Sequence, residues 1–148
     1  MKLLINSAPL VTSADKKISE LLKDLSKVRT DCILVVDHRS IVIGLVTRSD
    51  LISGLAENHK PLDDILVSEI MSQQVEFVRY SHLNSDIIKV FKDMEYSHFP
   101  VIRTEGSPAL SNLVGLINMT DIAKYIFKNY HTQMEKNGFL YFLQSANS

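Results

Sequence analysis

Several residue types are scarce in this sequence of 148 residues, and each scarcity excludes a class of protein. Its single cysteine, Cys32, cannot form a disulfide within the chain or build a metal site from thiolates, so we expect a small buried apolar residue in a reducing compartment. Long apolar runs are also missing. No segment approaches the roughly 20 apolar residues that a membrane-spanning helix needs, and polar residues interrupt the apolar start before it can serve as a signal peptide. These absences predict a cytoplasmic protein without a membrane partner.

An excess of charge of either sign is absent as well. The chain has 16 Lys and Arg and 17 Asp and Glu, which gives a net charge of −1. Proteins dedicated to nucleic acids normally carry a basic surplus that neutralises phosphates, so we expect no nucleic-acid partner. The five histidines lack the spacing of metal ligands, and the sequence shows no pattern of nucleophile and base. We therefore expect no metal site, no required cofactor and no catalytic activity.

The sequence contains an internal duplication. Residues 44–50 match residues 115–121, 71 positions later, and residues 33–36 match residues 99–102, 66 positions later. The five additional residues of the second copy fall within 104–112, which carries a glycine and a proline and which we expect to form a surface hairpin. A period near 70 residues is longer than the roughly 20 to 50 residues of a solenoid repeat. The pattern therefore indicates a duplicated small domain.

Each copy contains the same order of predicted elements. In the first copy, apolar residues recur at helical spacing over residues 18–29, and a continuous apolar run over 32–36 is typical of a buried strand. A returning strand over 41–46 and a second helix from Leu51 follow, and a short strand near Val11 precedes them. The second copy repeats the pattern, with strands over 75–78, 99–102 and 113–117 and helices over 87–94 and 122–127.

The fold class predicted from this pattern is α+β, with two tandem β-α-β-β-α repeats. One repeat alone buries too little apolar surface to be stable, so we expect the two to pack sheet to sheet with pseudo-two-fold symmetry. The predicted parts of the chain are a first repeat over 3–59, a connector over 60–72, a second repeat over 73–128 and an extension over 129–148. A dense apolar run in the extension, at 139–143, either covers the module's own core or forms a dimer interface, and we favour the interface.

Residues 44–50 and 96–101 carry a resemblance to a known family. The first segment, GLVTRSD, has the pattern Gly-apolar-apolar-Thr/Ser-x-x-Asp after the last strand of a repeat, and the second, YSHFPV, is similar to the family's pattern at the start of the central strand. Together with the doubled β-α-β-β-α order they resemble the CBS domain, and residues 3–128 resemble the pair of CBS domains known as a Bateman module. The resemblance implies an adenosine-type ligand in the clefts between the repeats: AMP, ADP, ATP, S-adenosylmethionine or cyclic di-AMP. It also implies a homodimer and a regulatory effect on a separate effector protein.

The spacing Thr47-x-x-Asp50 places two polar side chains where a strand ends and a helix begins. Unpaired N–H groups and the helix dipole favour a phosphate there, and a carboxylate accepts hydrogen bonds from the two hydroxyls of a ribose. The same spacing is a capping box, in which the hydroxyl and the carboxylate satisfy the helix's own N–H groups. Both roles are open from the spacing, and the same holds for Asn118-x-x-Asp121. Gly44, just before this segment, permits a close backbone approach or a bulge.

The resemblance extends the candidate ligand-binding residues beyond these positions. The full set is Thr47, Arg48, Asp50, Arg79, Tyr80, His98, Pro100, Asn118, Thr120 and Asp121. Arg48 suits a phosphate, although an isolated arginine on a helix surface is also typical of a solvated side chain, and His98 suits a ligand contact or a satisfied, partly buried position. Neither copy matches the family pattern fully, since Leu34 stands in place of proline in the first and Asn118 in place of Thr or Ser in the second. The alternative function is therefore a structural or dimerisation module with degenerate, empty clefts.

Overall fold

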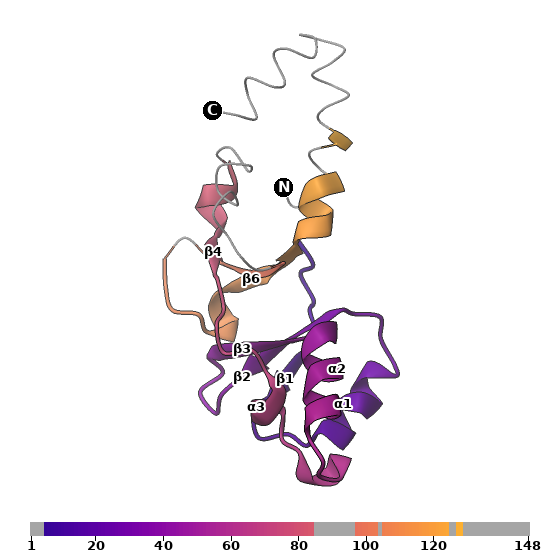
Figure 1. The fold of residues 1–148 in the computed structure, drawn as a ribbon. Helices are drawn as coiled ribbons and strands as arrows, with labels where there is room; N and C mark the ends of the chain where they lie inside the picture. The colour runs from indigo at the N-terminus through magenta and orange to yellow at the C-terminus, as the bar shows by residue number, and fades with distance from the viewer. Residues whose placement is uncertain (1–4, 85–96, 104, 125–126, 129–148) are drawn as a thin grey trace. The chain divides into compact units, whose positions relative to one another are not determined.

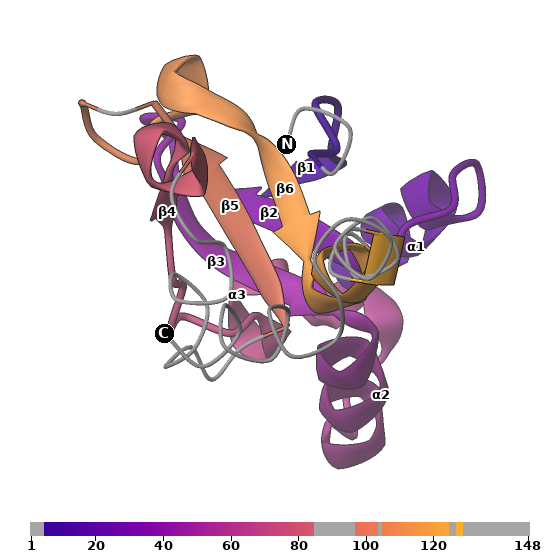
Figure 2. The same ribbon diagram turned by 90° about the horizontal axis from the view of Figure 1, so that it is seen from above.

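The structure is a computed structural model that describes residues 5–84, 97–103, 105–124 and 127–128. It contains two three-stranded sheets, in the orders β1-β2-β3 and β4-β5-β6, together with helices, which confirms the predicted α+β class (Figures 1 and 2). By its internal contacts the chain divides into two units. The first-repeat unit comprises residues 7–75 and 105–113, and the second-repeat unit comprises residues 1–6, 76–104 and 114–148.

The first-repeat unit has the predicted order of elements. They are β1 (Val11–Ser13), α1 (Ile18–Leu25), β2 (Cys32–Val36), β3 (Val42–Thr47) and α2 (Arg48–Glu57), followed by the 3₁₀ helix η2 (Leu62–Asp64) and the short helix α3 (Val67–Ile70). Strand β2 lies in the middle of the sheet, parallel to β1 and antiparallel to β3. All five residues of β2 are buried, as its continuous apolar run predicts.

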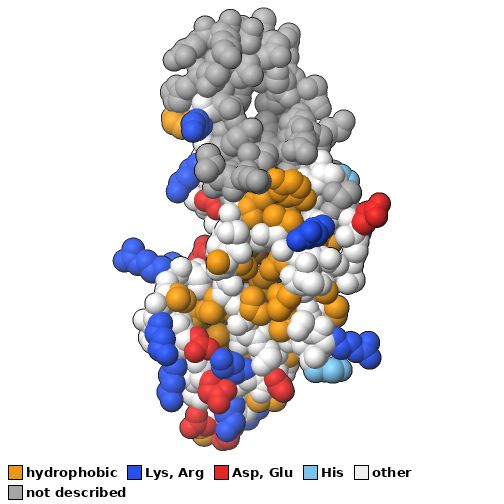
Figure 3. Space-filling view, turned by 180° about the vertical axis from the view of Figure 1, so that it is seen from behind, with side chains coloured by type: hydrophobic (Ala, Val, Ile, Leu, Met, Phe, Trp, Pro, Cys, Tyr) orange, Lys and Arg blue, Asp and Glu red, His pale blue; other side chains and the backbone are white. Residues whose placement is uncertain are grey.

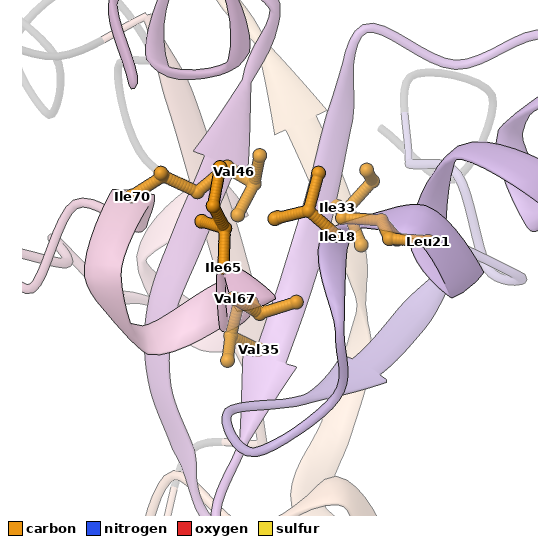
Figure 4. Close-up of a cluster of buried hydrophobic side chains, with 8 residues drawn as sticks. All are labelled: Ile18, Leu21, Ile33, Val35, Val46, Ile65, Val67 and Ile70. Atoms are coloured by element: carbon orange, nitrogen blue, oxygen red, sulfur yellow. The ribbon is translucent and has the colours of Figure 1, made fainter. Parts of the chain in front are cut away.

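The core of this unit draws on the segment after residue 60 as well as on the repeat itself. Figure 4 shows side chains from α1, β2, β3 and the segment 65–70 that point toward one another: Ile18, Leu21, Ile33, Val35, Val46, Ile65, Val67 and Ile70. The backbone is fixed at the same place, because the N–H of Ile18 donates to the carbonyl of Ile65 and the N–H of Val67 donates to the carbonyl of Lys16, both at 2.8 Å. The residues expected to connect the repeats therefore also contribute to the folding of the first.

The second-repeat unit repeats the strand order, although its helices are described only in part. Its elements are β4 (Val78–Arg79), the 3₁₀ helix η3 (Tyr80–Asn84), β5 (His98–Ile102) and β6 (Leu113–Asn118), with helical residues at 119–124 and 127–128. The lead-in strand predicted over 75–78 is shorter and begins at Val78. The helix predicted over 87–94 and the extension over 129–148 lie outside the described residues. In the part of the chain that is described, no helix is long and apolar enough to cross a membrane.

The segment before each repeat pairs with the last strand of the other repeat. Asn6 forms an antiparallel bridge with Leu116 of β6, with N–H to oxygen distances of 2.9 and 3.0 Å. Ser72 forms the same bridge with Leu45 of β3, at 2.8 and 2.9 Å. The bridges follow the offsets of the duplication, since Asn6 and Ser72 are 66 positions apart and Leu45 and Leu116 are 71 apart. We call this pairing, of the segment before one repeat with the last strand of the other, the exchange of lead-in segments. It occurs twice at equivalent positions and is therefore a property of the repeated unit.

This exchange accounts for the glycine in each copy of the motif. A Cβ added to Gly44 would lie 2.8 Å from the carbonyl oxygen of Ser72, and one added to Gly115 would lie still closer to the carbonyl oxygen of Asn6. Real Cβ atoms essentially never approach another atom that closely. The prediction that Gly44 permits a close backbone approach is confirmed.

The additional residues of the second copy also pair with the first repeat. The N–H of Val42 donates to the carbonyl of Pro108, and the N–H of Leu110 donates to the carbonyl of Ser40, both at 2.9 Å. The predicted surface hairpin is thus not freestanding, because it satisfies backbone groups where the last strand of the first sheet begins. These residues, within the 3₁₀ helix η4 (Leu110–Asn112) and the turn before it, belong to the first-repeat unit.

Candidate functional site

A pocket lies at the N-terminal end of α2, next to the beginning of β2. Its inner part has a volume of about 210 Å³, and a wider outer part has a volume of about 550 Å³. The inner part is lined by Leu25, Thr30, Asp31, Ile33, Val46, Thr47, Arg48 and Leu51, and the outer part by Val28, Arg29, Thr30, Asp31 and Arg48. Because the two parts share three lining residues, we treat them as one site and call it the α2 pocket.

A backbone hydrogen bond joins the two segments that form this pocket. The N–H of Arg48, the first residue of α2, donates to the carbonyl of Asp31, just before β2, at 3.3 Å. The same bond occurs in the second repeat, where the N–H of Met119 donates to the carbonyl of Ser97 at 2.8 Å. The partners are again related by the offsets of 71 and 66. In each repeat, the helix that follows the last strand, which we call the closing helix, therefore begins beside the start of the central strand.

Thr47 and Asp50 form the capping box that their spacing allows. The N–H of Asp50 donates to Oγ1 of Thr47 at 3.3 Å, and Oδ2 of Asp50 accepts from the N–H and the hydroxyl of Thr47 at 2.8 and 2.9 Å. The helix end therefore offers an anion fewer unpaired N–H groups than the sequence suggests, because those of Arg48 and Asp50 already donate to protein oxygens. Of the two candidate residues, Thr47 lines the α2 pocket and Asp50 does not.

The second copy of the motif is capped in a different way. The N–H of Asp121 donates to Oδ1 of Asn118 at 2.8 Å, so the asparagine accepts the helix N–H as Thr47 does in the first copy. Within the described residues, the carboxylate of Asp121 accepts no hydrogen bond, in contrast to that of Asp50. The two copies thus share the helix cap but differ in the engagement of the aspartate.

The remaining sequence-predicted site residues lie in the second-repeat unit. Arg79 ends β4 and Tyr80 begins η3, and both side chains are half-buried. On β5, His98 is half-buried with its Nδ1 2.9 Å from the hydroxyl oxygen of Ser97, and Pro100 is buried. Thr120 lies exposed in the first turn of the closing helix. The structure therefore brings Thr47 and Arg48 together in the α2 pocket and places these residues, with Asn118 and Asp121, on the second repeat.

Sequence analysis missed Arg29, Thr30 and Asp31 as site residues. A signal exists for Thr30 and Asp31, because the offset of 66 maps the start of the central strand at 96–98 onto residues 30–32, whereas Arg29 maps onto Glu95, outside the family pattern. The segment was overlooked because the first copy lacks the proline that marks the pattern in the second.

The neighbouring thiol is not a reactive group. Cys32 is 1% exposed, and burial raises the pKa of its thiol to about 12, with smaller contributions from the carboxylates of Asp31 and Asp50. At neutral pH the side chain is therefore a neutral, small apolar group, as predicted. Among the described residues, no three or more His, Cys, Asp or Glu side chains are grouped so that they could hold a metal ion.

The charged surface around the first-repeat unit is mixed in sign. Figure 3 shows acidic and basic side chains side by side over the lower part of the face in view, with apolar side chains above them. Two ion pairs in this unit join Lys16 to Asp24 and Lys60 to Glu69. Within the described part of the chain, Arg29 and Arg48 form no such pair, as is also the case for Lys17, Lys23, Lys27 and Arg39.

Comparisons with curated proteins identify relatives of this chain. The methylated protein MJ0556 of Methanocaldococcus jannaschii is 29% identical over 132 residues, which cover 85% of this chain and 72% of that protein. Protein MK0525 of Methanopyrus kandleri is 24% identical over 107 residues, which cover 70% of this chain and 52% of that protein. The chain thus spans about half the length of the second relative.

A solved structure shares the fold, and a family model covers most of the chain. The CBS domain pair of protein MJ0100, determined in complex with 5′-methylthioadenosine and S-adenosyl-L-methionine, has a TM-score of 0.65 and 23% identity, and the match covers 86% of this chain and 95% of that one. The family model for the CBS domain matches residues 3–57 and 67–128. The two matched segments, the duplicated motif and the two equivalent sheets agree, and the chain belongs to the CBS domain family, of which it carries two repeats.

Proposed function

We propose that this protein is a cytoplasmic ligand-sensing module that binds an adenosine-type ligand and modulates a separate effector protein. The observation that carries the proposal is the α2 pocket, which lies where the family motif ends β3 and begins α2. The candidate ligands are AMP, ADP, ATP, S-adenosylmethionine and cyclic di-AMP. The CBS pair of protein MJ0100 supports this class, since it holds S-adenosylmethionine and methylthioadenosine.

The lining of the pocket suits a ligand with an apolar ring and a polar remainder. Leu25, Ile33, Val46 and Leu51 line the inner part, and a flat heterocyclic base is stabilised by such apolar contacts. Thr30, Asp31 and Arg48 line both parts and offer a hydroxyl, a carboxylate and a guanidinium group to a ribose or a phosphate. The outer part, of about 550 Å³, is open to solvent, so a polar remainder there stays partly hydrated while the ring occupies the inner part of about 210 Å³.

A regulatory effect requires that the ligand bind one arrangement of the protein more tightly than another. A ligand in the α2 pocket contacts the segment before β2 and the first turn of α2 together, and these are joined by the bond from Arg48 to Asp31. A movement of the start of α2 relative to the segment before β2 changes the surface that α2 presents to an effector. The role proposed here is therefore non-catalytic, and the output is a change in the affinity for the effector.

The alternative is an interaction module that dimerises through the same fold without a ligand. The complete capping box favours it, because Asp50 already has a structural role. Large apolar side chains are also exposed on α2 and in the closing helix, with Ile52 at 65% and Phe127 at 64%. We propose a homodimer in either case. Light scattering of the purified protein tests it, and a monomeric mass over the micromolar range contradicts it.

Thermal unfolding of the full chain with a panel of adenosine-type ligands separates the two functions. A ligand at 100 times its dissociation constant stabilises the folded state by about 2.7 kcal/mol, which is readily measured. Asp50→Asn and Asp121→Asn serve as variants, because both lose the charge that suits ribose hydroxyls. At position 50 the amide oxygen can still accept the hydrogen bond from the N–H of Thr47, and at position 121 the cap involves only the backbone N–H. No stabilisation by any ligand of the panel contradicts the sensing function and leaves the interaction module.

A further inference from the structure

Two arginines line the outer part of the α2 pocket. Arg29 follows α1 and Arg48 begins α2, and both side chains are exposed. Neither guanidinium group forms a hydrogen bond or an ion pair within the described residues, and Asp31 is the one acidic residue in the lining. The pocket therefore presents two available cationic groups and one carboxylate to a ligand. Arginine is well suited to phosphate, since its planar fork donates two parallel hydrogen bonds to an oxyanion.

The position of Arg48 adds to this preference. It is the first residue of a ten-residue helix, and the N-terminal end of a helix carries a partial positive charge. The N–H groups of Arg48 and Asp50 are already engaged by the protein, so the side chains supply most of the hydrogen-bond donors at this end. Selectivity for a negatively charged ligand thus depends on the two guanidinium groups.

The second repeat does not reproduce this arrangement. The offset of 66 maps Arg29 onto Glu95, and the offset of 71 maps Arg48 onto Met119. An acidic and an apolar residue therefore occupy the sequence positions of the two arginines. Met119 is 39% exposed at the start of the closing helix, where Arg48 stands in the first repeat. The duplicated chain has kept the motif in both copies but has arginines at these two positions only in the first.

We infer that the α2 pocket binds the phosphate groups of an adenine nucleotide, that Arg29 and Arg48 select for them, and that the chain binds one such ligand. The inference rests on the proposed function and narrows its ligand class. Phosphate-bearing nucleotides are favoured over adenosine, which has no charge, and over S-adenosylmethionine, whose sulfonium and ammonium groups are cationic. At the two sequence positions equivalent to Arg29 and Arg48, the second repeat has Glu95 and Met119, neither of which carries a positive charge.

Isothermal titration of the full chain with ATP, AMP, adenosine and S-adenosylmethionine tests this inference. We expect ATP to bind most tightly, with one site per chain. Arg29→Gln and Arg48→Gln are each expected to weaken ATP binding by about tenfold to a hundredfold, as the loss of a charge-assisted hydrogen bond does, and to leave adenosine binding within about threefold. Arg39→Gln is the matched control, because Arg39 is an exposed arginine of the same unit that does not line the pocket.

The possible results distinguish this inference from the proposed function. If none of the four ligands binds the wild-type chain, the proposed function fails and the inference fails with it. If adenosine or S-adenosylmethionine binds as tightly as ATP, or if neither arginine variant weakens ATP binding more than Arg39→Gln does, only the inference is wrong. Two ATP molecules per chain also overturn it. Circular dichroism of each variant confirms that a loss of binding does not result from unfolding.

Discussion

The substitution Gly44→Ala tests the exchange of lead-in segments at the bridge between Ser72 and Leu45 of β3. The added Cβ would lie 2.7 Å from the sulfur of Met71 and 2.8 Å from the carbonyl oxygen of Ser72. The sulfur is on a flexible side chain and can move away. The oxygen belongs to the backbone and is held by the N–H of Leu45 at 2.9 Å, so it can move only if the bridge between the two segments opens.

The expected loss of stability follows from these contacts. Overfilling a packed site costs about 1–3 kcal/mol, and each hydrogen bond of the strained bridge contributes about 1 kcal/mol. Alanine regains about 0.5–1 kcal/mol relative to glycine, because it restricts the unfolded chain. We therefore expect Gly44→Ala to lower the free energy of unfolding by about 2–3 kcal/mol, measured by urea denaturation at neutral pH.

A second variant identifies the group that resists the substitution. In Gly44→Ala/Met71→Ala the contact with sulfur is removed while the carbonyl of Ser72 stays in place. The double variant is expected to be no more stable than Gly44→Ala, because the backbone contact remains. A Gly44→Ala protein within about 0.5 kcal/mol of wild type, which is the usual range for surface substitutions, would refute the reasoning. Recovery of full stability in the double variant would assign the cost to the methionine.

Three further substitutions test other parts of the first-repeat unit. Thr12→Val is expected to raise the free energy of unfolding by about 1–2 kcal/mol in urea denaturation, because Oγ1 of Thr12 is buried without a hydrogen-bond partner among the described residues; a decrease would show that the hydroxyl is satisfied. Ile65→Ala is expected to lower the free energy of unfolding by about 2–5 kcal/mol in the same assay, and an unchanged value would remove the segment after residue 60 from the core. The N–H groups of Ile41 and Arg39 donate to the carboxylate of Asp37 and hold its pKa below the ordinary value of 3.8, so this stabilisation is present above about pH 4 and is lost as the pH falls through the lower folded value. Asp37→Asn is expected to show a smaller loss of thermal stability than wild type between pH 5 and pH 2 in melting curves, and an equal loss would assign the acid sensitivity to other carboxylates.

The order of elements in the first repeat was predictable because the apolar pattern is local. The period of α1 and the continuous apolar run of β2 are properties of single segments, and packing in the folded protein does not override them. The bridge from Asn6 to Leu116 joins residues that are 110 positions apart, and no local pattern records such a pair. The duplication alone gives a sign of this pairing in the sequence, because the glycine that each bridge requires recurs at the same place in both copies.

The motif at the candidate site was recognisable in the sequence, whereas most of the residues that line the α2 pocket were not. Thr47 and Arg48 were found because they lie within the recognised motif, whereas Arg29 and Asp31 lie in a loop whose composition is ordinary for a protein surface. They line the α2 pocket because the N–H of Arg48 donates to the carbonyl of Asp31, which holds two segments that are distant in the sequence next to each other.

The role of Asp50 shows why spacing alone could not decide between a helix cap and a ribose contact. Both roles require a carboxylate three residues after a hydroxyl at the start of a helix, so the same residues satisfy both. The structure shows Asp50 as part of the helix cap, because its Oδ2 accepts hydrogen bonds from the N–H and the hydroxyl of Thr47. A ribose that binds Asp50 must share or replace these bonds, whereas one that binds Asp121 displaces no hydrogen bond within the described residues. Ribose binding at Asp50 therefore carries an energetic penalty, which the proposed phosphate contacts of Arg29 and Arg48 must offset.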